Sequence, residues 1–299
     1  IAMVIIMKKN IILFLFIFFA FACSNKSTSN DYVWNNHNDA GEDGDVTQDT
    51  SNDITNPDVS DVDGGEEPPI PDLVGTWANV QVNGSLINVP MVGVKSNRIV
   101  SLVLVQMAQE GKTLRVRETV CDIKNETDTS LVTTVIPQAF IESLPVEEKE
   151  TSLVFVDGHW VYDQPQHWAL QGVHLDDVVN DPLPTEATDP RVFDQDEDGH
   201  PGLTVRVTGL INGDIYVIQR GWNTMRSHEF AGDRIYGYME WGNEQVVLDA
   251  TNDILKQPIE SVVDPNPAKS WFEFVRVTPD FTCAEMIDQK ETLFPRLAQ

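Results

Sequence analysis

Carboxylates stand at alternate positions in the stretch from Asp194 to His200, which reads Asp-Gln-Asp-Glu-Asp-Gly-His. A hard cation such as calcium takes side-chain oxygens from positions 1, 3 and 5 of such a loop, a bend at a glycine, and a carbonyl at position 7. Asp194, Asp196 and Asp198 match the side-chain positions, and His200 matches the carbonyl position. The sequence therefore predicts a calcium site at these four residues. The alternative is a solvated acidic turn without an ion.

The pattern resembles the first half of the aspartate-rich loops in EF-hand, dockerin and thrombospondin type 3 modules. Val205 occupies the twelfth position, where an EF-hand carries a glutamate, so another ligand is expected to come from elsewhere in the chain. The candidates for this ligand are Asp177, Glu186 and Asp189. The expected role of calcium is to stiffen the proline-rich crossing over residues 176–201, which joins two groups of predicted strands.

Three histidines, His159, His167 and His174, lie near one another among aspartates and aromatic residues. Such a set suits zinc binding or acid–base chemistry. The spacing lacks the His-x-x-x-His pattern of a helical metal site, and the chain has no Gly-x-Ser-x-Gly, P-loop or dinucleotide-binding motif. We therefore predict no catalytic residue. The alternatives are a metal-dependent hydrolase centred on the three histidines, or a surface that stacks carbohydrate on the neighbouring aromatic rings.

From Leu73 onward the sequence consists of short runs rich in Val, Ile, Thr, Tyr and Trp, which favour strands. Turn-forming pairs such as Asn83-Gly84, Glu110-Gly111, Asp157-Gly158 and Gly242-Asn243 separate the runs. The expected strands cover residues 73–82, 85–94, 98–108, 113–123, 130–136, 152–156, 203–211, 215–220, 234–241, 245–248 and 270–277. They predict a mostly β fold, an antiparallel meander that closes as a barrel because closure removes exposed edges. A β-sandwich is the alternative.

Two helices are expected beside the strands. The first is predicted over residues 137–144, with proline at its first position. The second begins at a capping box formed by Thr282 and Glu285 and ends before Pro295. Its apolar stripe consists of Cys283, Met286, Ile287, Leu293 and Phe294. We expect this C-terminal amphipathic helix to pack outside the sheet, completing a single domain over residues 73–299.

Two features of the β region resemble the lipocalin superfamily. The sequence Gly75-Thr76-Trp77 opens the first predicted strand, and Arg276 lies in the last. The resemblance implies that Trp77 packs against Arg276 at the closed end of an eight-stranded barrel. This chain departs from the lipocalin pattern in its greater length and in a helix that follows the last strand. The resemblance therefore concerns architecture, and no ligand is inferred from it.

The stretch from Met7 to Cys23 has a basic head, an apolar run over residues 11–22 and then a cysteine. The run is shorter than the approximately 20 apolar residues of a membrane-spanning helix. It resembles a bacterial lipoprotein signal peptide, which implies removal of residues 1–22 and lipidation of Cys23. Ser24 rather than aspartate after the cysteine implies an outer-membrane location in the cell envelope. The alternative is an ordinary secretory signal.

The chain has a formal net charge of −27, and it carries no Lys or Arg between Lys26 and Lys95. Residues 23–72 are rich in Asp, Glu, Asn, Ser, Thr and Gly, and they lack apolar periodicity. Such a composition cannot bury enough surface to offset its ordering entropy, so an acidic, disordered tether is predicted. The acidic balance also excludes nucleic acid as a partner, because phosphate binding needs clustered Lys and Arg.

Cys121 and Cys283 remain once Cys23 is assigned to lipidation. An even number of cysteines in an exported protein favours a disulfide, which would fasten the C-terminal helix to the outer face of the sheet. Two separately buried thiols are the alternative.

The signal-like N-terminus, the acidic tether, the predicted strands and the acidic loop together predict a lipid-anchored envelope protein whose β domain is a calcium-stabilised binding or structural module. An envelope assembly subunit is a further alternative, and the ligand class (small molecule, carbohydrate or protein) is left open.

Overall fold

The computed structural model describes residues 67–89, 93–129, 131–257 and 261–298. The predictions for residues 1–22, for lipidation of Cys23 and for most of the tether over residues 23–72 lie outside these ranges. Within them, no helix has the length and apolar character needed to cross a membrane.

Strands make up most of the described chain, as predicted. The strands are β1 (Gly75–Val89), β2 (Gly93–Glu110), β3 (Thr113–Thr127), β4 (Val132–Val135), β5 (Glu147–Val156), β6 (His159–Gln171), β7 (Leu203–Gly209), β8 (Gly213–Ala231), β9 (Arg234–Ala250), β10 (Ser261–Val263) and β11 (Trp271–Val277). The helices are α1 (Gln138–Ser143) and α2 (Cys283–Leu293), with 3₁₀ turns η1 (Asp253–Lys256), η2 (Pro267–Lys269) and η3 (Pro295–Ala298). Pro137 caps α1 instead of opening it.

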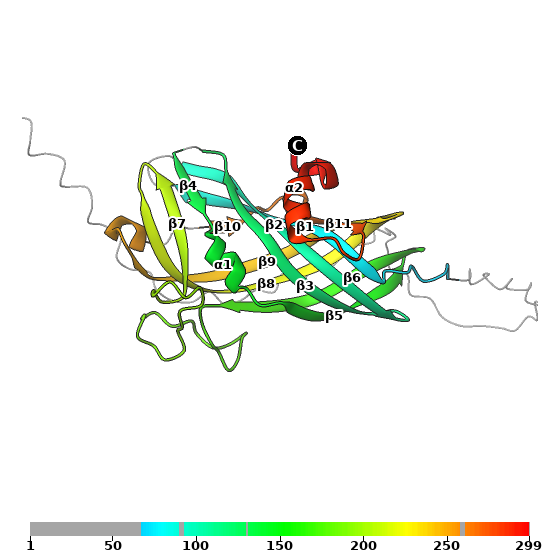
Figure 1. Ribbon diagram of the computed structural model, residues 1–299, viewed down its shortest axis with the longest axis horizontal. Helices are drawn as coiled ribbons and strands as arrows, with labels where there is room; N and C mark the ends of the chain where they lie inside the picture. Colours follow the sequence, from blue (N-terminus) through cyan, green and yellow to red (C-terminus); the bar gives the residue numbers. More distant parts are fainter. Residues whose placement is uncertain (1–66, 90–92, 130, 258–260, 299) are drawn as a thin grey trace, which may run out of the picture. The chain divides into compact units, whose positions relative to one another are not determined.

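Eight strands pair in a closed ring, in the order β8-β6-β5-β3-β2-β1-β11-β9, because β9 also pairs with β8 (Figure 1). The remaining strands extend this ring at one end: β7 pairs with the first part of β8, β4 pairs with β7, and β10 pairs with the last part of β1. Every pairing between named strands is antiparallel, which confirms the predicted antiparallel sheet.

The turns predicted at Asn83-Gly84 and Gly242-Asn243 are wrong, because β1 and β9 run through both positions without a break. Each glycine instead lets another segment of the same chain approach the strand closely. A Cβ added at Gly84 would lie 2.6 Å from the Cβ of Lys269, and one at Gly242 would lie 2.6 Å from the indole nitrogen of Trp222. A glycine in a strand interior often marks such an approach, and here that use replaces the hairpin turn.

One end of the ring is filled by apolar side chains from all eight of its strands. The buried residues are Trp77, Val103, Val105, Met107, Leu114, Val116, Leu153, Trp160, Tyr162, Met225, Ile235, Met239, Phe272 and Phe274, joined by Leu73. The Arg276 guanidinium lies 4.3 Å from the Trp77 ring centre, and the indole N–H of Trp77 donates to the Leu73 carbonyl at 2.9 Å. This Trp77–Arg276 contact is the one that the Gly-x-Trp pattern implies. We call this end the closed end.

The outer face of β1 and β2 lies beneath α2. Ala78, Val80 and Val82 alternate with the inward-facing residues of β1 and pack against Met286 and Phe294. The predicted capping box of Thr282 and Glu285 is present, and Cys121 and Cys283 form the predicted disulfide with Cα atoms 5.1 Å apart. Ile287 was assigned to the apolar stripe of α2, but its side chain is exposed and does not join the apolar cluster beneath the helix.

Candidate functional site

A cavity of about 810 Å³ occupies the ring interior at the end away from the closed end. Its wall is built from β1, β2, β3, β6, β8 and β9 of the ring and from β4, β7, β10, α1 and η1 beyond it. The position follows from the strand registers. On β2, Met107 lies in the closed end, whereas Asn97 and Ile99 line the cavity. Ile254 and Val263 line the cavity and are also exposed to solvent, so they mark its mouth.

The cavity wall combines aliphatic and carboxamide side chains. Its amides are Asn88, Asn97, Asn125, Gln171, Gln219, Asn243, Gln245 and Gln257. Among the described residues that form the wall there is no Asp, Glu, Lys, Arg or His, although charged residues make up 22% of the whole chain. The wall therefore offers hydrogen bonds without a formal charge.

The amides reach the cavity because inward-facing positions recur every second residue along a strand. Trp241, Asn243 and Gln245 follow this period on β9. The Asn97 carboxamide is engaged, because its N–H donates to Ser85 and its oxygen accepts from the Thr127 hydroxyl at 2.7 Å. The buried side-chain oxygen of Asn125 has no partner. It is an acceptor available to a ligand.

A belt of buried polar residues separates the cavity from the closed end. On β3, Glu118 lies between Val116 of the closed end and Ile123 of the cavity wall. The Glu118 carboxylate pairs with Lys149 at 2.8 Å, and only 7% and 6% of the two side chains are exposed. Within the same belt, Gln164 donates to Asn223 at 2.8 Å. These pairs form a polar layer beneath the cavity.

The three histidines do not form the cluster considered from the sequence. His159 is exposed at the start of β6, whereas the His167 ring lies 3.3 Å from the carboxylate of Glu147. His167 lowers the pKa of Glu147, chiefly through this hydrogen bond. His174 follows β6 and stacks on Phe193 with ring centres 4.3 Å apart. None of the three lines the cavity, and none belongs to a group of metal-ligating side chains among the described residues.

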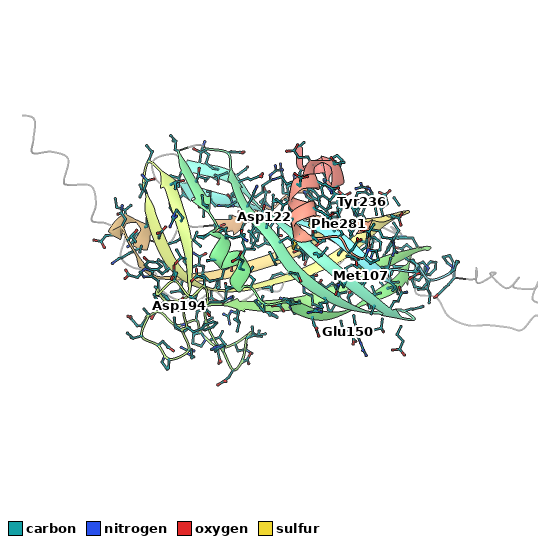
Figure 2. The ribbon with its side chains drawn as sticks, viewed as in Figure 1. Met107, Asp122, Glu150, Asp194, Tyr236 and Phe281 are labelled. Atoms are coloured by element: carbon teal, nitrogen blue, oxygen red, sulfur yellow. A yellow bond between two sulfur atoms is a disulfide. The ribbon has the colours of Figure 1, made fainter. Side chains whose placement is uncertain are left out.

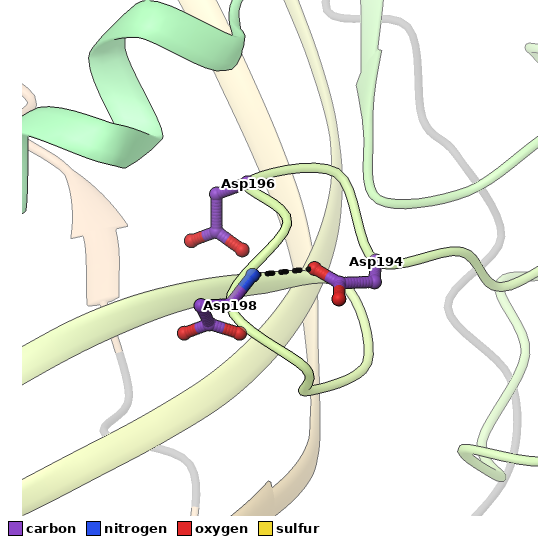
Figure 3. A group of neighbouring side chains, drawn as sticks. All are labelled: Asp194, Asp196 and Asp198. Carbon is purple, nitrogen blue, oxygen red and sulfur yellow. Dashed lines mark hydrogen bonds between the residues drawn. The ribbon is translucent and has the colours of Figure 1, made fainter.

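The predicted aspartates of the acidic loop do come together. Asp194, Asp196 and Asp198 each offer a carboxylate oxygen, and these atoms lie within 4.8 Å of one another (Figure 3). The Asp194 carboxylate accepts the backbone N–H groups of Asp198 at 3.2 Å and Gly199 at 2.8 Å. The loop closes at Glu197, whose φ of 56° is left-handed, and at Gly199. Figure 2 shows Asp194 and the closed-end residue Met107 toward opposite ends of the view.

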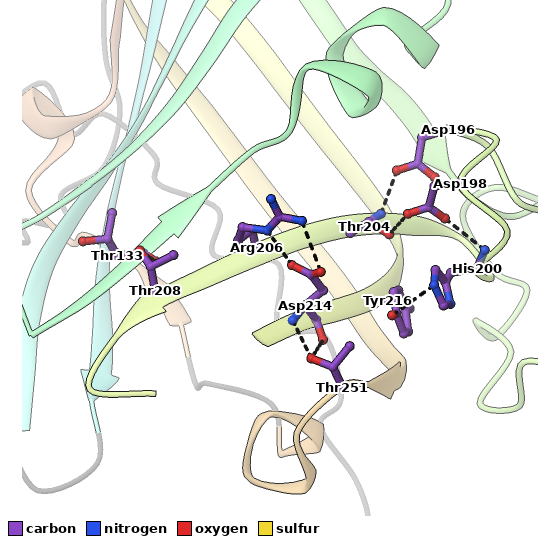
Figure 4. A network of polar contacts seen from close by, with 10 residues as sticks. All are labelled: Thr133, Asp196, Asp198, His200, Thr204, Arg206, Thr208, Asp214, Tyr216 and Thr251. Atoms are coloured by element: carbon purple, nitrogen blue, oxygen red, sulfur yellow. Dashed lines mark hydrogen bonds and ion pairs between the residues drawn. The ribbon is translucent and has the colours of Figure 1, made fainter. Parts of the chain in front are cut away.

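Asp196 is the buried member of the triad, with 9% of its surface exposed. One carboxylate oxygen accepts the backbone N–H of Thr204 at 2.9 Å, and the other has no partner. Burial, together with the charges of Asp198 and Asp194, raises the pKa of Asp196. The Thr204 hydroxyl donates to Asp198, and the His200 ring stacks on Tyr216 with centres 4.0 Å apart (Figure 4).

The further ligands predicted for this loop do not join it. Asp189 forms two hydrogen bonds to the guanidinium of Arg191, at 3.0 and 2.9 Å, and these hydrogen bonds hold its pKa at about 2. The Asp177 carboxylate accepts the backbone N–H groups of Val179 and Asn180 at 2.9 and 3.0 Å. Neither carboxylate, nor that of Glu186, belongs to the triad. The carboxylates of Asp189 and Asp177 instead accept hydrogen bonds within local turns of the crossing between β6 and β7.

Neither the cavity nor the polar layer beneath it was predicted from the sequence, although one signal for buried polar residues inside the ring was present. Asn79 and Gln81 share the inward face of β1 with Trp77, and both are buried. An amide at an inward position has the same alternation as a solvent-facing residue, so the pattern alone did not distinguish them.

Comparison of the chain with protein-family models, with curated proteins and with solved structures gave no match.

Proposed function

We propose that the β domain is a binding module that takes up one small, uncharged molecule with an apolar body and a few hydrogen-bonding groups. The single observation that carries this proposal is the cavity of about 810 Å³, whose described wall contains no charged or titratable side chain of Asp, Glu, Lys, Arg or His. Cavities of roughly 300–1,000 Å³ are typical of small-molecule sites.

The chemistry of the wall supports this ligand class. Burial of apolar ligand surface contributes about 25 cal/mol per Å², whereas an ion that enters an uncharged pocket loses hydration without gaining a partner. The free oxygen of Asn125 and the amides of Gln171 and Gln245 offer polar contacts that orient a ligand. We further propose that the ring closes as a barrel, supported by the complete circuit of strand pairings. The closed end is then its floor, and the site is a pocket rather than a channel.

A pair of fluorescent probes with the same aromatic body tests the charge preference. We expect N-phenyl-1-naphthylamine, which is uncharged at neutral pH, to bind at least about tenfold more tightly than 8-anilinonaphthalene-1-sulfonate, because the sulfonate has no cationic partner in the wall. Fluorescence titration of the full chain measures both, with Cys23→Ala present so that no acyl chain competes. Tighter binding of the sulfonate would contradict the proposal.

A variant with a matched control tests whether the probe binds in the cavity. The Gln219 side-chain oxygen lies 3.5 Å from the Asn243 amide nitrogen, and a glutamate keeps this acceptor while adding a charge. We expect Gln219→Glu to weaken the neutral probe at least about tenfold, because binding would desolvate a carboxylate. Gln106→Glu makes the same change on the exposed outer face of β2 and should leave the affinity within about twofold. Equal effects of the two variants would place the probe elsewhere.

We also propose that this module is anchored in the cell envelope through Cys23. The basic head and apolar run before Cys23 support it, and the Cys121–Cys283 disulfide suits an oxidising compartment. We expect the protein to incorporate a labelled fatty acid and to fractionate with membranes, because two or more acyl chains give stable anchoring. Cys23→Ala should abolish the label and release the protein, whereas Cys121→Ala should retain the label. An unlabelled wild-type protein in the soluble fraction would refute the anchor.

A further inference from the structure

The acidic loop after β6 brings three negative charges close together, and the proposed ligand site does not explain this arrangement. Three carboxylates, from Asp194, Asp196 and Asp198, converge within 4.8 Å, and no salt bridge in the described ranges reaches any of them. Like charges at such distances repel one another, and burial increases the repulsion. Hydrogen bonds from backbone N–H groups satisfy Asp194, but they do not neutralise the group.

A second, independent feature is the unpaired oxygen of Asp196. Only 9% of this residue is exposed, and one of its carboxylate oxygens is buried without a hydrogen-bond donor. Figure 3 shows the Asp196 carboxylate turned toward Asp194 and Asp198. Buried charged oxygens are ordinarily paired or coordinate a metal. The missing partner of Asp196 therefore belongs on the side where the other two carboxylates lie.

We propose that Asp194, Asp196 and Asp198 bind one calcium ion. Calcium takes oxygen ligands at about 2.3–2.6 Å, so two ligands on opposite sides of one ion lie roughly 5 Å apart. The separations in the triad fit within this limit. Asp194 and Asp198 are exposed, which leaves room for the water ligands that complete a calcium shell. Carboxylate oxygens without nitrogen or sulfur ligands also favour calcium over zinc.

The ion would fasten the crossing between β6 and β7 to the cavity wall. Thr204 at the start of β7 donates to Asp196 and Asp198, and Val205 beside it lines the cavity. Between the first two aspartates, Gln195 accepts the backbone N–H of Gly172 at 2.7 Å and donates to the Ser143 carbonyl at the end of α1, at 3.2 Å. The crossing therefore contacts β7, the end of β6 and α1. Calcium would hold these contacts in place.

Calorimetric titration of the calcium-stripped full chain tests the site directly. We expect one calcium ion per chain and binding at least about tenfold weaker in Asp196→Asn, which keeps an acceptor for the Thr204 N–H but removes the charge. Glu197→Gln removes one charge from the same loop outside the triad, and it should change the affinity less than about threefold. Absence of binding to the wild type at millimolar calcium, or equal affinities of wild type and Asp196→Asn, would overturn the proposal.

Hydrogen exchange and thermal unfolding locate the effect. Calcium at 100 times its dissociation constant should slow amide exchange over residues 172–204 and raise the unfolding midpoint by about 5–10 °C in the wild type but not in Asp196→Asn. Slowed exchange confined to another part of the chain would overturn the assignment. These readouts do not depend on the uncharged probe, so failure of the cavity proposal and failure of the calcium proposal can be told apart.

Discussion

Loss of the Cys121–Cys283 disulfide is expected to lower the free energy of unfolding by about 2–5 kcal/mol. The bond joins residues 162 positions apart, so its removal frees a long loop in the unfolded chain. It also fastens α2 over Ala78, Val80 and their neighbours, which would otherwise face solvent. At about 2–4 °C per kcal/mol for a domain of this size, the unfolding midpoint should fall by roughly 4–20 °C.

The double variant Cys121→Ala/Cys283→Ala measures this loss, with calorimetry or circular dichroism as the readout. A reductant should lower the midpoint of the wild type toward that of the double variant and leave the double variant unchanged. This comparison separates the bond from general effects of the reductant. If the reductant shifted both midpoints equally, or neither, the disulfide would not contribute to stability.

Gly237→Ala is expected to destabilise the domain by about 3 kcal/mol or more. A Cβ at this position of β9 would lie 2.3 Å from the Phe272 ring and 2.4 Å from the carbonyl oxygen of Arg226. Phe272 is fully buried in the closed end, and a backbone oxygen cannot move without disturbing β8. Overpacking of a filled core typically costs about 1–3 kcal/mol, and a clash with backbone adds to that cost.

Gly221→Ala is the matched control for this prediction. Gly221 lies in the interior of the adjacent strand β8, but the nearest atom to an added Cβ would be 3.6 Å away, an ordinary contact. Because glycine is disfavoured in strand interiors, this variant should be neutral or up to about 1 kcal/mol more stable. Chemical denaturation of both variants gives the comparison. Similar destabilisation by the two would show that loss of glycine itself, and not the closed end, is responsible.

The hairpins that the sequence predicted correctly are those whose turn residues lie between strands and face solvent. Asp157-Gly158 turns with positive φ at both residues, as its composition indicates, and Glu110-Gly111 ends β2. The C-terminal helix was predictable because Thr282 and Glu285 form a purely local capping box. The disulfide could be inferred because few cysteines are present.

Other elements could not be predicted because distant contacts determine them. Gly84 and Gly242 have the local signature of a turn, but tertiary contacts decide their use: Lys269 approaches Gly84 from a distant part of the sequence, and Trp222 approaches Gly242 from the paired strand β8. The strand β6 contains Pro165, which argues against a strand; the structure places it in the irregularity between Gln164 and His167, where no ladder hydrogen bond is lost. The cavity depends on nine ring and edge strands at once, so no single segment reveals it.

The acidic loop could be predicted only in part. Its spacing predicted that Asp194, Asp196 and Asp198 would converge, because a short loop with a glycine bend brings alternate residues together. The buried environment of Asp196 could not be predicted, since it arises where the loop meets the beginning of β7 at Thr204. Local spacing therefore indicated the oxygen donors, and tertiary packing determined which of them is shielded from water.

The chain enters the ring at its closed end. The Trp160 indole donates to the Pro68 carbonyl, and Leu73 packs into the apolar core there, while the cavity mouth lies toward the opposite end of the ring. A linker attached directly at residue 67 would consequently begin at the end of the ring opposite the cavity mouth. A tag that replaces residues 1–66 is the preferred handle for screening compounds, whereas an insertion in the loop before η1 would lie beside the mouth residue Ile254.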